Sequence, residues 1–90
     1  MKLEPDRPVK VEVTHTECER TKLGDVFYFN GPFLNCETSC SICVTALVSI
    51  YPWIMTARYG IESDNLGWKD GYRIWCPEKS VEFLISPYDG

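Results

Sequence analysis

The sequence lacks the short motifs by which many enzymes are identified. Its 90 residues contain no glycine-rich phosphate loop, no Ser-His-Asp set and no H-E-x-x-H metal motif. Four of the acidic residues lie in predicted turns, where solvated carboxylates are normal, and they give no support for a catalytic carboxylate pair: Asp25, Asp64, Asp70 and Glu78. The sequence therefore names no substrate and no reaction, and it leaves enzymatic activity open.

Basic patches, long apolar runs and a signal peptide are also missing. The net charge is −4, which argues against binding to nucleic acid or to an anionic membrane surface. The longest apolar run, near residues 44–55, is interrupted by Thr45, Ser49 and Pro52 and is shorter than the roughly 20 residues that span a bilayer. Residues 1–8 are polar and carry no apolar segment of a signal peptide. We therefore expect a cytoplasmic protein that binds small molecules or proteins.

The composition is that of a single globular domain. Hydrophobic residues make up 44% of the chain and charged residues 24%, which excludes a disordered protein. We assign residues 1–90 to one domain, with an N-terminal tail at 1–8 and a C-terminal tail at 86–90. Because so small a core gives modest stability, we expect a homodimer or another protein partner. Four aromatic residues are predicted to be exposed and available to that partner: Trp53, Trp68, Trp75 and Tyr88.

One helix is predicted in the middle of the chain. From Ser39 onward, apolar residues recur at the spacing of one helix face: Ile42, Cys43, Ala46, Leu47, Ile50 and Ile54. Thr38 or Ser39 is predicted to cap its start, and Gly60 to take the left-handed conformation that ends it. Pro52 removes one amide donor from the interior, so we expect a single kinked helix.

Strands are predicted on both sides of this helix. Val9, Val11 and Val13 alternate with polar residues, and a short aromatic strand follows at 26–29. After the helix, strands at 72–76 and 81–85 form a hairpin. We therefore predict an α+β fold in the order β-β-α-β-β, with the helix packed on one face of a small, mostly antiparallel sheet.

His15 is predicted to continue the valine side of the first strand. A lone histidine can be a metal ligand or a base, but at a strand end it is more often simply exposed or satisfied. Phe33 and Leu34, which follow the second strand, are predicted to cover one end of the core and to leave the cysteines beyond them shielded but near the surface. That position suits a ligand site.

The five cysteines form the main candidate site. Cys36, Cys40 and Cys43 make a C-x3-C-x2-C run, whose last two members are predicted to lie one helical turn apart. Zinc or an iron–sulfur cluster takes such thiolates and usually a fourth, here Cys76 or Cys18. Radical enzymes use the same spacing, but 90 residues cannot supply the barrel that their chemistry needs.

Two other roles for the cysteines remain open. Cys43, and with it Cys40, can be a small apolar core residue, since unpaired cysteine is among the most buried residue types. The protein would then be a structural subunit for protein–protein interaction. A thiol enzyme or redox protein is the third alternative, because C-x2-C pairs also serve thiol exchange. In a reducing compartment, an odd number of cysteines makes a set of structural disulfides the least favoured arrangement.

Several segments of the chain carry a family resemblance. They are Leu23-Gly24-Asp25, the helix segment with Ala46-Leu47 and Ile50-Tyr51-Pro52, Ala57-Arg58-Tyr59-Gly60, Trp68, and Cys76-Pro77-Glu78 ahead of Val81 and Phe83. In these segments, over about residues 9–86, the chain resembles a family of small uncharacterised prokaryotic proteins. That family has no established activity, so the resemblance implies a fold and a site location but no reaction.

The resemblance also implies a particular set of thiols. The recurrent cysteines of the family correspond to Cys18, Cys43 and Cys76, which come from three separate segments. They are the predicted metal ligands, and Cys36 and Cys40 are additional thiols that would assist in binding a cofactor. The sequence departs from the family at Val44, where the family tends to have proline. We expect these thiolates to meet at the N-terminal end of the central helix, whose partial positive charge lowers thiol pKa values.

Overall fold

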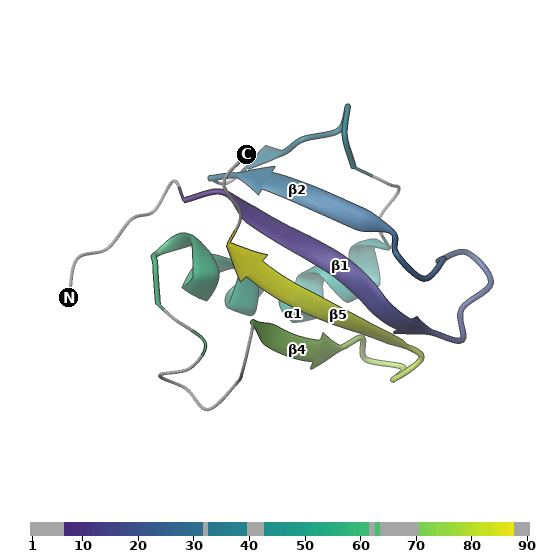
Figure 1. Ribbon diagram of the computed structural model, residues 1–90. Helices are drawn as coiled ribbons and strands as arrows, with labels where there is room; N and C mark the ends of the chain where they lie inside the picture. Colours follow the sequence, from purple (N-terminus) through teal and green to yellow (C-terminus); the bar gives the residue numbers. More distant parts are fainter. Residues whose placement is uncertain (1–6, 32, 40–42, 62, 64–70, 88–90) are drawn as a thin grey trace.

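A helix packed across one face of an antiparallel sheet makes up the fold (Figure 1). The computed structural model describes residues 7–31, 33–39, 43–61, 63 and 71–87. In chain order the elements are β1 (Val9–Thr16), β2 (Val26–Asn30), β3 (Phe33–Leu34), α1 (Val44–Arg58), β4 (Tyr72–Trp75) and β5 (Val81–Pro87). The sheet has the order β3-β2-β1-β5-β4. The predicted α+β fold is confirmed, and β3, only two residues long, is the strand that the prediction missed.

The two ends of the chain supply the middle of the sheet. β1 pairs antiparallel with β2 on one side and with β5 on the other, so residues from both ends lie side by side. The alternation predicted for β1 is confirmed as far as Val13, and every second residue of β2 and β5 is buried in the same core: Val9, Val11, Val13, Phe27, Phe29, Val81, Phe83 and Ile85. This arrangement brings the far end of β1 next to the turn between β4 and β5.

A β-bulge near the end of β1 corrects the prediction for His15. Val13 pairs with Phe83 but His15 pairs with Glu82, so one additional residue is inserted in β1. That residue, Thr14, donates a hydrogen bond from its hydroxyl to Glu82 Oε1 at 2.8 Å. The bulge breaks the alternation, and the exposed ring of His15 lies against Trp75, with 5.4 Å between ring centroids. His15 therefore does not continue the buried valine side.

The helix α1 is a single element that continues through Pro52. Its buried residues recur every three or four positions and face the sheet: Ala46, Ile50, Ile54 and Ala57. Gly60 ends it with φ of 80°, as predicted. The amide of Gly60 donates to the carbonyl of Ala57, and that of Ile61 to the carbonyl of Thr56, which together form a Schellman motif.

The helix begins at Val44, later than predicted. Its N-cap is Cys43, in an extended conformation with φ of −72° and ψ of 123°, so Thr38 and Ser39 do not cap it. Ser39 has another role: its hydroxyl accepts a hydrogen bond from the backbone amide of Tyr28 at 2.8 Å and ties the connection to β2. Cys43 therefore precedes the first helical turn, and Cys40 lies outside the described residues.

Three further predictions about surface and boundaries differ from the structure. Phe33 is 76% exposed, so only Leu34 of that pair packs against the core. Trp53 is half-buried rather than exposed, because its ring packs on that of Tyr72 at 5.6 Å between centroids. Trp75 is exposed as predicted. The last strand extends to Pro87 and includes the start of the expected tail, whereas Trp68 and Tyr88 fall outside the described ranges.

Among the described parts of the chain there is no helix long and apolar enough to cross a lipid bilayer.

Candidate thiol pocket

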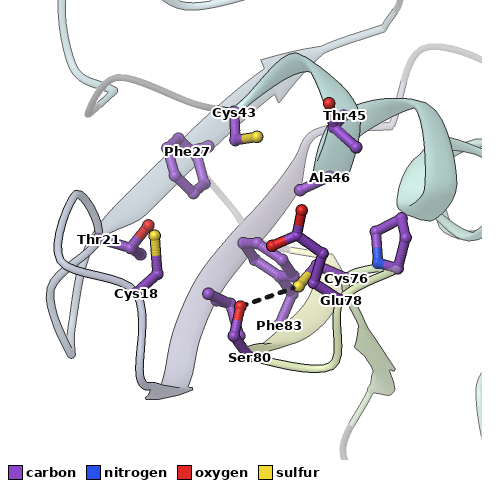
Figure 2. A pocket seen from close by; sticks show the side chains of 12 residues that line it. Cys18, Thr21, Phe27, Cys43, Thr45, Ala46, Cys76, Glu78, Ser80 and Phe83 are labelled. Carbon is purple, nitrogen blue, oxygen red and sulfur yellow. Dashed lines mark hydrogen bonds between the residues drawn. The ribbon is translucent and has the colours of Figure 1, made fainter.

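A pocket of about 110 Å³ opens where three connections meet (Figure 2). It lies between the loop after β1, the start of α1 and the turn that joins β4 to β5. Cysteines from these three segments, Cys18, Cys43 and Cys76, all line it. The remaining lining residues are Thr21, Phe27, Thr45, Ala46, Pro77, Glu78, Ser80, Val81 and Phe83. We call this space the thiol pocket.

Cys76 is placed by the turn between β4 and β5. Its amide donates to the carbonyl of Val81 at 2.9 Å, and its carbonyl accepts from the amide of Lys79 at 2.8 Å, which closes a tight turn with Pro77 inside it. Lys79 takes the left-handed conformation with φ of 57°. Only 8% of Cys76 is exposed, so its sulfur is reached through the thiol pocket rather than from the open surface.

The same turn favours the thiolate form of Cys76. Burial raises the pKa of this thiol, but hydrogen bonds from the Ser80 hydroxyl and from the backbone amides of Val81, Ser80 and Glu78 lower it, and the net pKa lies below the ordinary value for cysteine. The Ser80 oxygen lies 3.5 Å from the sulfur. A thiolate is the form of cysteine that binds metals and attacks electrophiles. Cys76 is therefore the thiol of the pocket best prepared for either chemistry.

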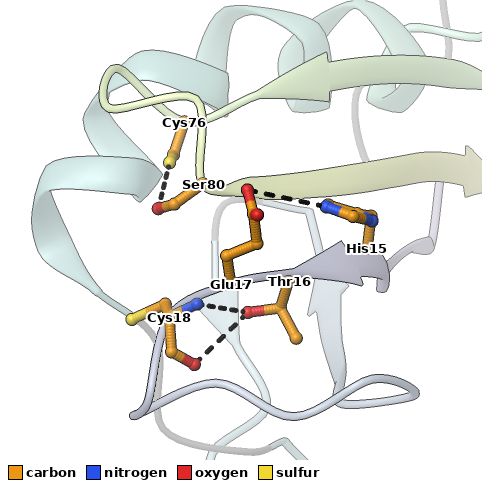
Figure 3. A network of polar contacts seen from close by, with 6 residues as sticks. All are labelled: His15, Thr16, Glu17, Cys18, Cys76 and Ser80. Carbon is orange, nitrogen blue, oxygen red and sulfur yellow. Dashed lines mark hydrogen bonds and ion pairs between the residues drawn. The ribbon is translucent and has the colours of Figure 1, made fainter.

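Cys18 is anchored to the neighbouring turn, although it lies in a loop (Figure 3). Its amide donates to the Thr16 hydroxyl at 3.0 Å. The preceding amide, that of Glu17, donates to the carbonyl of Ser80 at 2.8 Å. Ser80 thus contacts the backbone beside Cys18 and the sulfur of Cys76. The half-buried Cys18 is fixed beside the thiol pocket by these bonds.

Cys43 contributes the third thiol from the N-cap of α1. It is exposed, and its carbonyl accepts the first bond of the helix from the amide of Leu47 at 2.9 Å. No side chain caps the helix start, and the first turn contains no acidic residue. Thr45 and Ala46 line the thiol pocket, so the partially positive end of the helix faces it.

The other predicted site residues lie elsewhere. Cys36 is exposed, does not line the thiol pocket, and its sulfur lies 3.8 Å from the carbonyl oxygen of Leu34. Cys40 is outside the described residues. The exposed His15 lies 3.8 Å from a carboxylate oxygen of Glu17 and does not line the pocket. Within the described ranges, no three His, Cys, Asp or Glu side chains are close enough to hold a metal ion together.

No motif in the sequence points to Ser80, the residue that links two of the three thiols. The sequence alone predicts it only as part of the loop between two strands of a hairpin. Its position four residues after Cys76, across a turn that begins with Cys-Pro, was the available signal. Its contact with the backbone beside Cys18 depends on the pairing of β1 with β5, which local sequence does not specify.

Replacing Ser80 with alanine is expected to slow alkylation of Cys76. The substitution removes one of the hydrogen bonds that lower the pKa of this thiol, so a smaller fraction is thiolate at neutral pH. We expect iodoacetamide to react about threefold more slowly, after allowing for the greater intrinsic reactivity of a more basic thiolate. The rate is measured at Cys76 by peptide mass spectrometry. Thr21→Ala, which changes the same pocket without removing that bond, is the control, and a rate that does not fall in Ser80→Ala contradicts the assignment.

Comparisons with known proteins found no match to a protein-family model, to a curated protein or to a solved structure. The family resemblance carried by the sequence motifs therefore stays a prediction.

Proposed function

We propose that the protein is a small metal-binding accessory module whose thiol pocket holds a thiophilic ion, with zinc the simplest case. One observation carries the proposal: cysteines from three separate segments, Cys18, Cys43 and Cys76, line one pocket. Thiolates are preferred ligands of zinc and of iron–sulfur clusters. These three residues are the ligands that we propose the pocket supplies.

The surroundings of the thiols support this proposal. Amide and hydroxyl donors favour the thiolate of Cys76, which is the form that coordinates metal. The N-terminus of α1, whose first turn contains no acidic residue, faces the same pocket with its partial positive charge. Glu78 also lines the pocket, and its carboxylate offers an oxygen ligand of a type that zinc accepts.

Binding of an ion requires the pocket to contract, because its thiols are not close enough to share one in the described arrangement. Hydrogen bonds hold the backbone of Cys18 beside the turn of Cys76, so the side chain of Cys18 would have to rotate towards Cys76. A fourth ligand is needed to close a structural site, and Cys40, three residues before Cys43 in the sequence, is the proposed donor. Metal bound in this way would join three connections of the fold, so it would also stabilise the folded chain.

Metal content of the purified protein is the test of this proposal. Protein purified anaerobically is expected to contain about one equivalent of zinc, or iron with sulfide if a cluster is bound. Cys18→Ser, Cys43→Ser and Cys76→Ser should each weaken metal binding. The loss should exceed the roughly 10- to 100-fold that follows when a residue hydrogen-bonded to a metal ligand is removed. Elemental analysis and competition with a chromogenic chelator measure these two quantities.

Cys36→Ser is the matched control, because Cys36 is exposed and does not line the pocket. This variant should keep full metal content. Traces of zinc and iron that are equal in all variants would contradict the proposal and leave the cysteines as structural thiols.

A structural interaction subunit is the second candidate. It is supported by apolar residues on the outer side of α1, where Val44 and Val48 are each 70% exposed and Met55 is 37% exposed. Near Met55 a groove is lined by Pro52, Thr56, Tyr59 and Ile61. We propose a second copy of the chain as the occupant of this face. This function needs the apolar face and not the thiols, so a Cys18→Ser/Cys76→Ser variant that keeps its oligomeric state but loses metal separates the two candidates.

A further inference from the structure

We propose that the thiol pocket carries out thiol–disulfide exchange with low-molecular-weight disulfides, in which Cys76 is the attacking thiol and Cys18 the resolving thiol. This goes beyond metal binding, because it assigns a covalent reaction and a different class of partner to the pocket. Neither thiol needs a bound ion for the exchange.

The position of Cys76 suits the attacking role. Its side chain faces the pocket (Figure 2), and 8% of the residue is exposed to solvent in all. The Ser80 oxygen lies 3.5 Å from the sulfur and can donate a hydrogen bond to a thiolate. Phe27, Val81 and Phe83 supply apolar walls beside it. A small disulfide that enters the pocket would therefore meet the Cys76 sulfur between apolar walls, in contact with the Ser80 hydroxyl.

Cys18 is the resolving thiol because its segment is bonded to the same turn as Cys76. The amide of Glu17 donates to the Ser80 carbonyl at 2.8 Å, while the Ser80 hydroxyl contacts the sulfur of Cys76 (Figure 3). One residue therefore connects the two thiols. Cys43 also lines the pocket, but it stands at the start of α1 and not on the segment that is bonded to the turn of Cys76.

The size of the pocket restricts the partner. A volume of about 110 Å³ accepts the end of an aliphatic disulfide such as cystamine, but not a folded protein that presents a disulfide on a broad surface. The acidic Glu78 at the pocket adds a preference for disulfides that carry an amine. Cystamine is a small aliphatic disulfide with an ammonium group at each end, so it meets both the size limit and the charge preference.

The reaction balances as two successive exchanges. The Cys76 thiolate attacks one sulfur of the small disulfide, forms a mixed disulfide and releases one small thiolate, which takes up a proton. The thiolate of Cys18 then attacks the Cys76 sulfur, forms the Cys18–Cys76 disulfide and releases the second small thiolate. The small disulfide accepts two electrons and is reduced to two thiols, and the protein loses two thiol hydrogens.

Intact-mass and peptide mass spectrometry of the reduced full-length protein with cystamine test this inference. The reaction contains a metal chelator, so its outcome does not depend on the proposed metal site. In the wild-type protein, Cys76 should be modified first, at least about tenfold faster than exposed Cys36, and the product should be the Cys18–Cys76 disulfide. Cys18→Ser should instead accumulate the mixed disulfide at Cys76, at least about tenfold above its wild-type level. Cys36→Ser, which changes an exposed thiol that does not line the pocket, should behave as the wild type does.

Two results would overturn the inference. One is wild-type modification of Cys76 no faster than that of Cys36, which peptide mapping shows without any substitution. The other is a mixed disulfide at Cys76 that persists equally in the wild-type protein and in Cys18→Ser, which excludes Cys18 as the resolving thiol. Failure of metal binding leaves both measurements unaffected, so the two proposals fail separately.

Discussion

Replacing Gly71 with alanine is expected to destabilise the protein by about 3 kcal/mol. Gly71 has φ of 130°, a conformation that residues with a side chain rarely adopt. A Cβ added there would lie 2.7 Å from the carbonyl oxygen of Ile85 and 2.9 Å from Leu84 Cδ1. Since the nearest atom belongs to the backbone of β5, rotation of a side chain cannot relieve the clash, and the start of β4 would have to move away from β5. Urea denaturation measures the loss in the free energy of unfolding.

Gly24 provides the matched control for this substitution. Its φ is 89°, and a Cβ added there would meet nothing within 4 Å. Gly24→Ala therefore carries only the cost of the backbone conformation, about 1 kcal/mol. Equal losses in the two variants would show that close contact with β5 does not set the requirement for glycine at position 71.

Replacing Ile54 with alanine is expected to destabilise the protein by about 2–5 kcal/mol. Ile54 is fully buried between α1 and the sheet, so truncation removes apolar burial and leaves a cavity that neighbours fill only in part. For a domain of this size the melting temperature should fall by roughly 10–25 °C. Circular dichroism during heating gives the midpoint.

Val48→Ala tests the same helix on its exposed side. Val48 is 70% exposed, so its truncation should change the free energy of unfolding by no more than about 0.5 kcal/mol. A loss at Val48 as large as that at Ile54 would mean that the outer face of α1 is covered in solution, as the proposed second copy of the chain would require.

The fold could be predicted where its signal is periodic. The alternation of Val9, Val11 and Val13 gives a strand with one buried face, and the spacing from Ala46 to Ile54 gives a helix face. The end of the helix was also predictable, because Gly60 suits the left-handed conformation by its own chemistry. The first strand, the buried face of the helix and the end of the helix are each set by residues close together in the sequence.

The start of the helix could not be predicted in the same way. Ser39 has the hydroxyl of a good N-cap, but that oxygen accepts a hydrogen bond from Tyr28, on the preceding strand β2. The helix then begins at Val44 without a side-chain cap. The prediction that His15 continues the buried side of β1 is wrong for a similar reason. The bulge that turns this residue outward is a property of the pairing between β1 and β5.

The candidate site depends still more on long-range pairing. The cysteines themselves are visible in the sequence, but the run from Cys36 to Cys43 suggested a local cluster. The structure places Cys18 beside the turn that carries Cys76, because β5 lies between β1 and β4 in the sheet. Ser80 acquires its importance from the same strand order. Local spacing carries no information about that order.

X-ray absorption at the zinc edge of the zinc-loaded protein shows whether zinc is bound by the cysteines of the thiol pocket. The proposed site predicts sulfur neighbours at about 2.3 Å from zinc, and fewer of them in Cys76→Ser, with no change in Cys36→Ser. A first shell of nitrogen and oxygen alone, or a sulfur shell that Cys76→Ser leaves unchanged, would contradict a metal site in the thiol pocket.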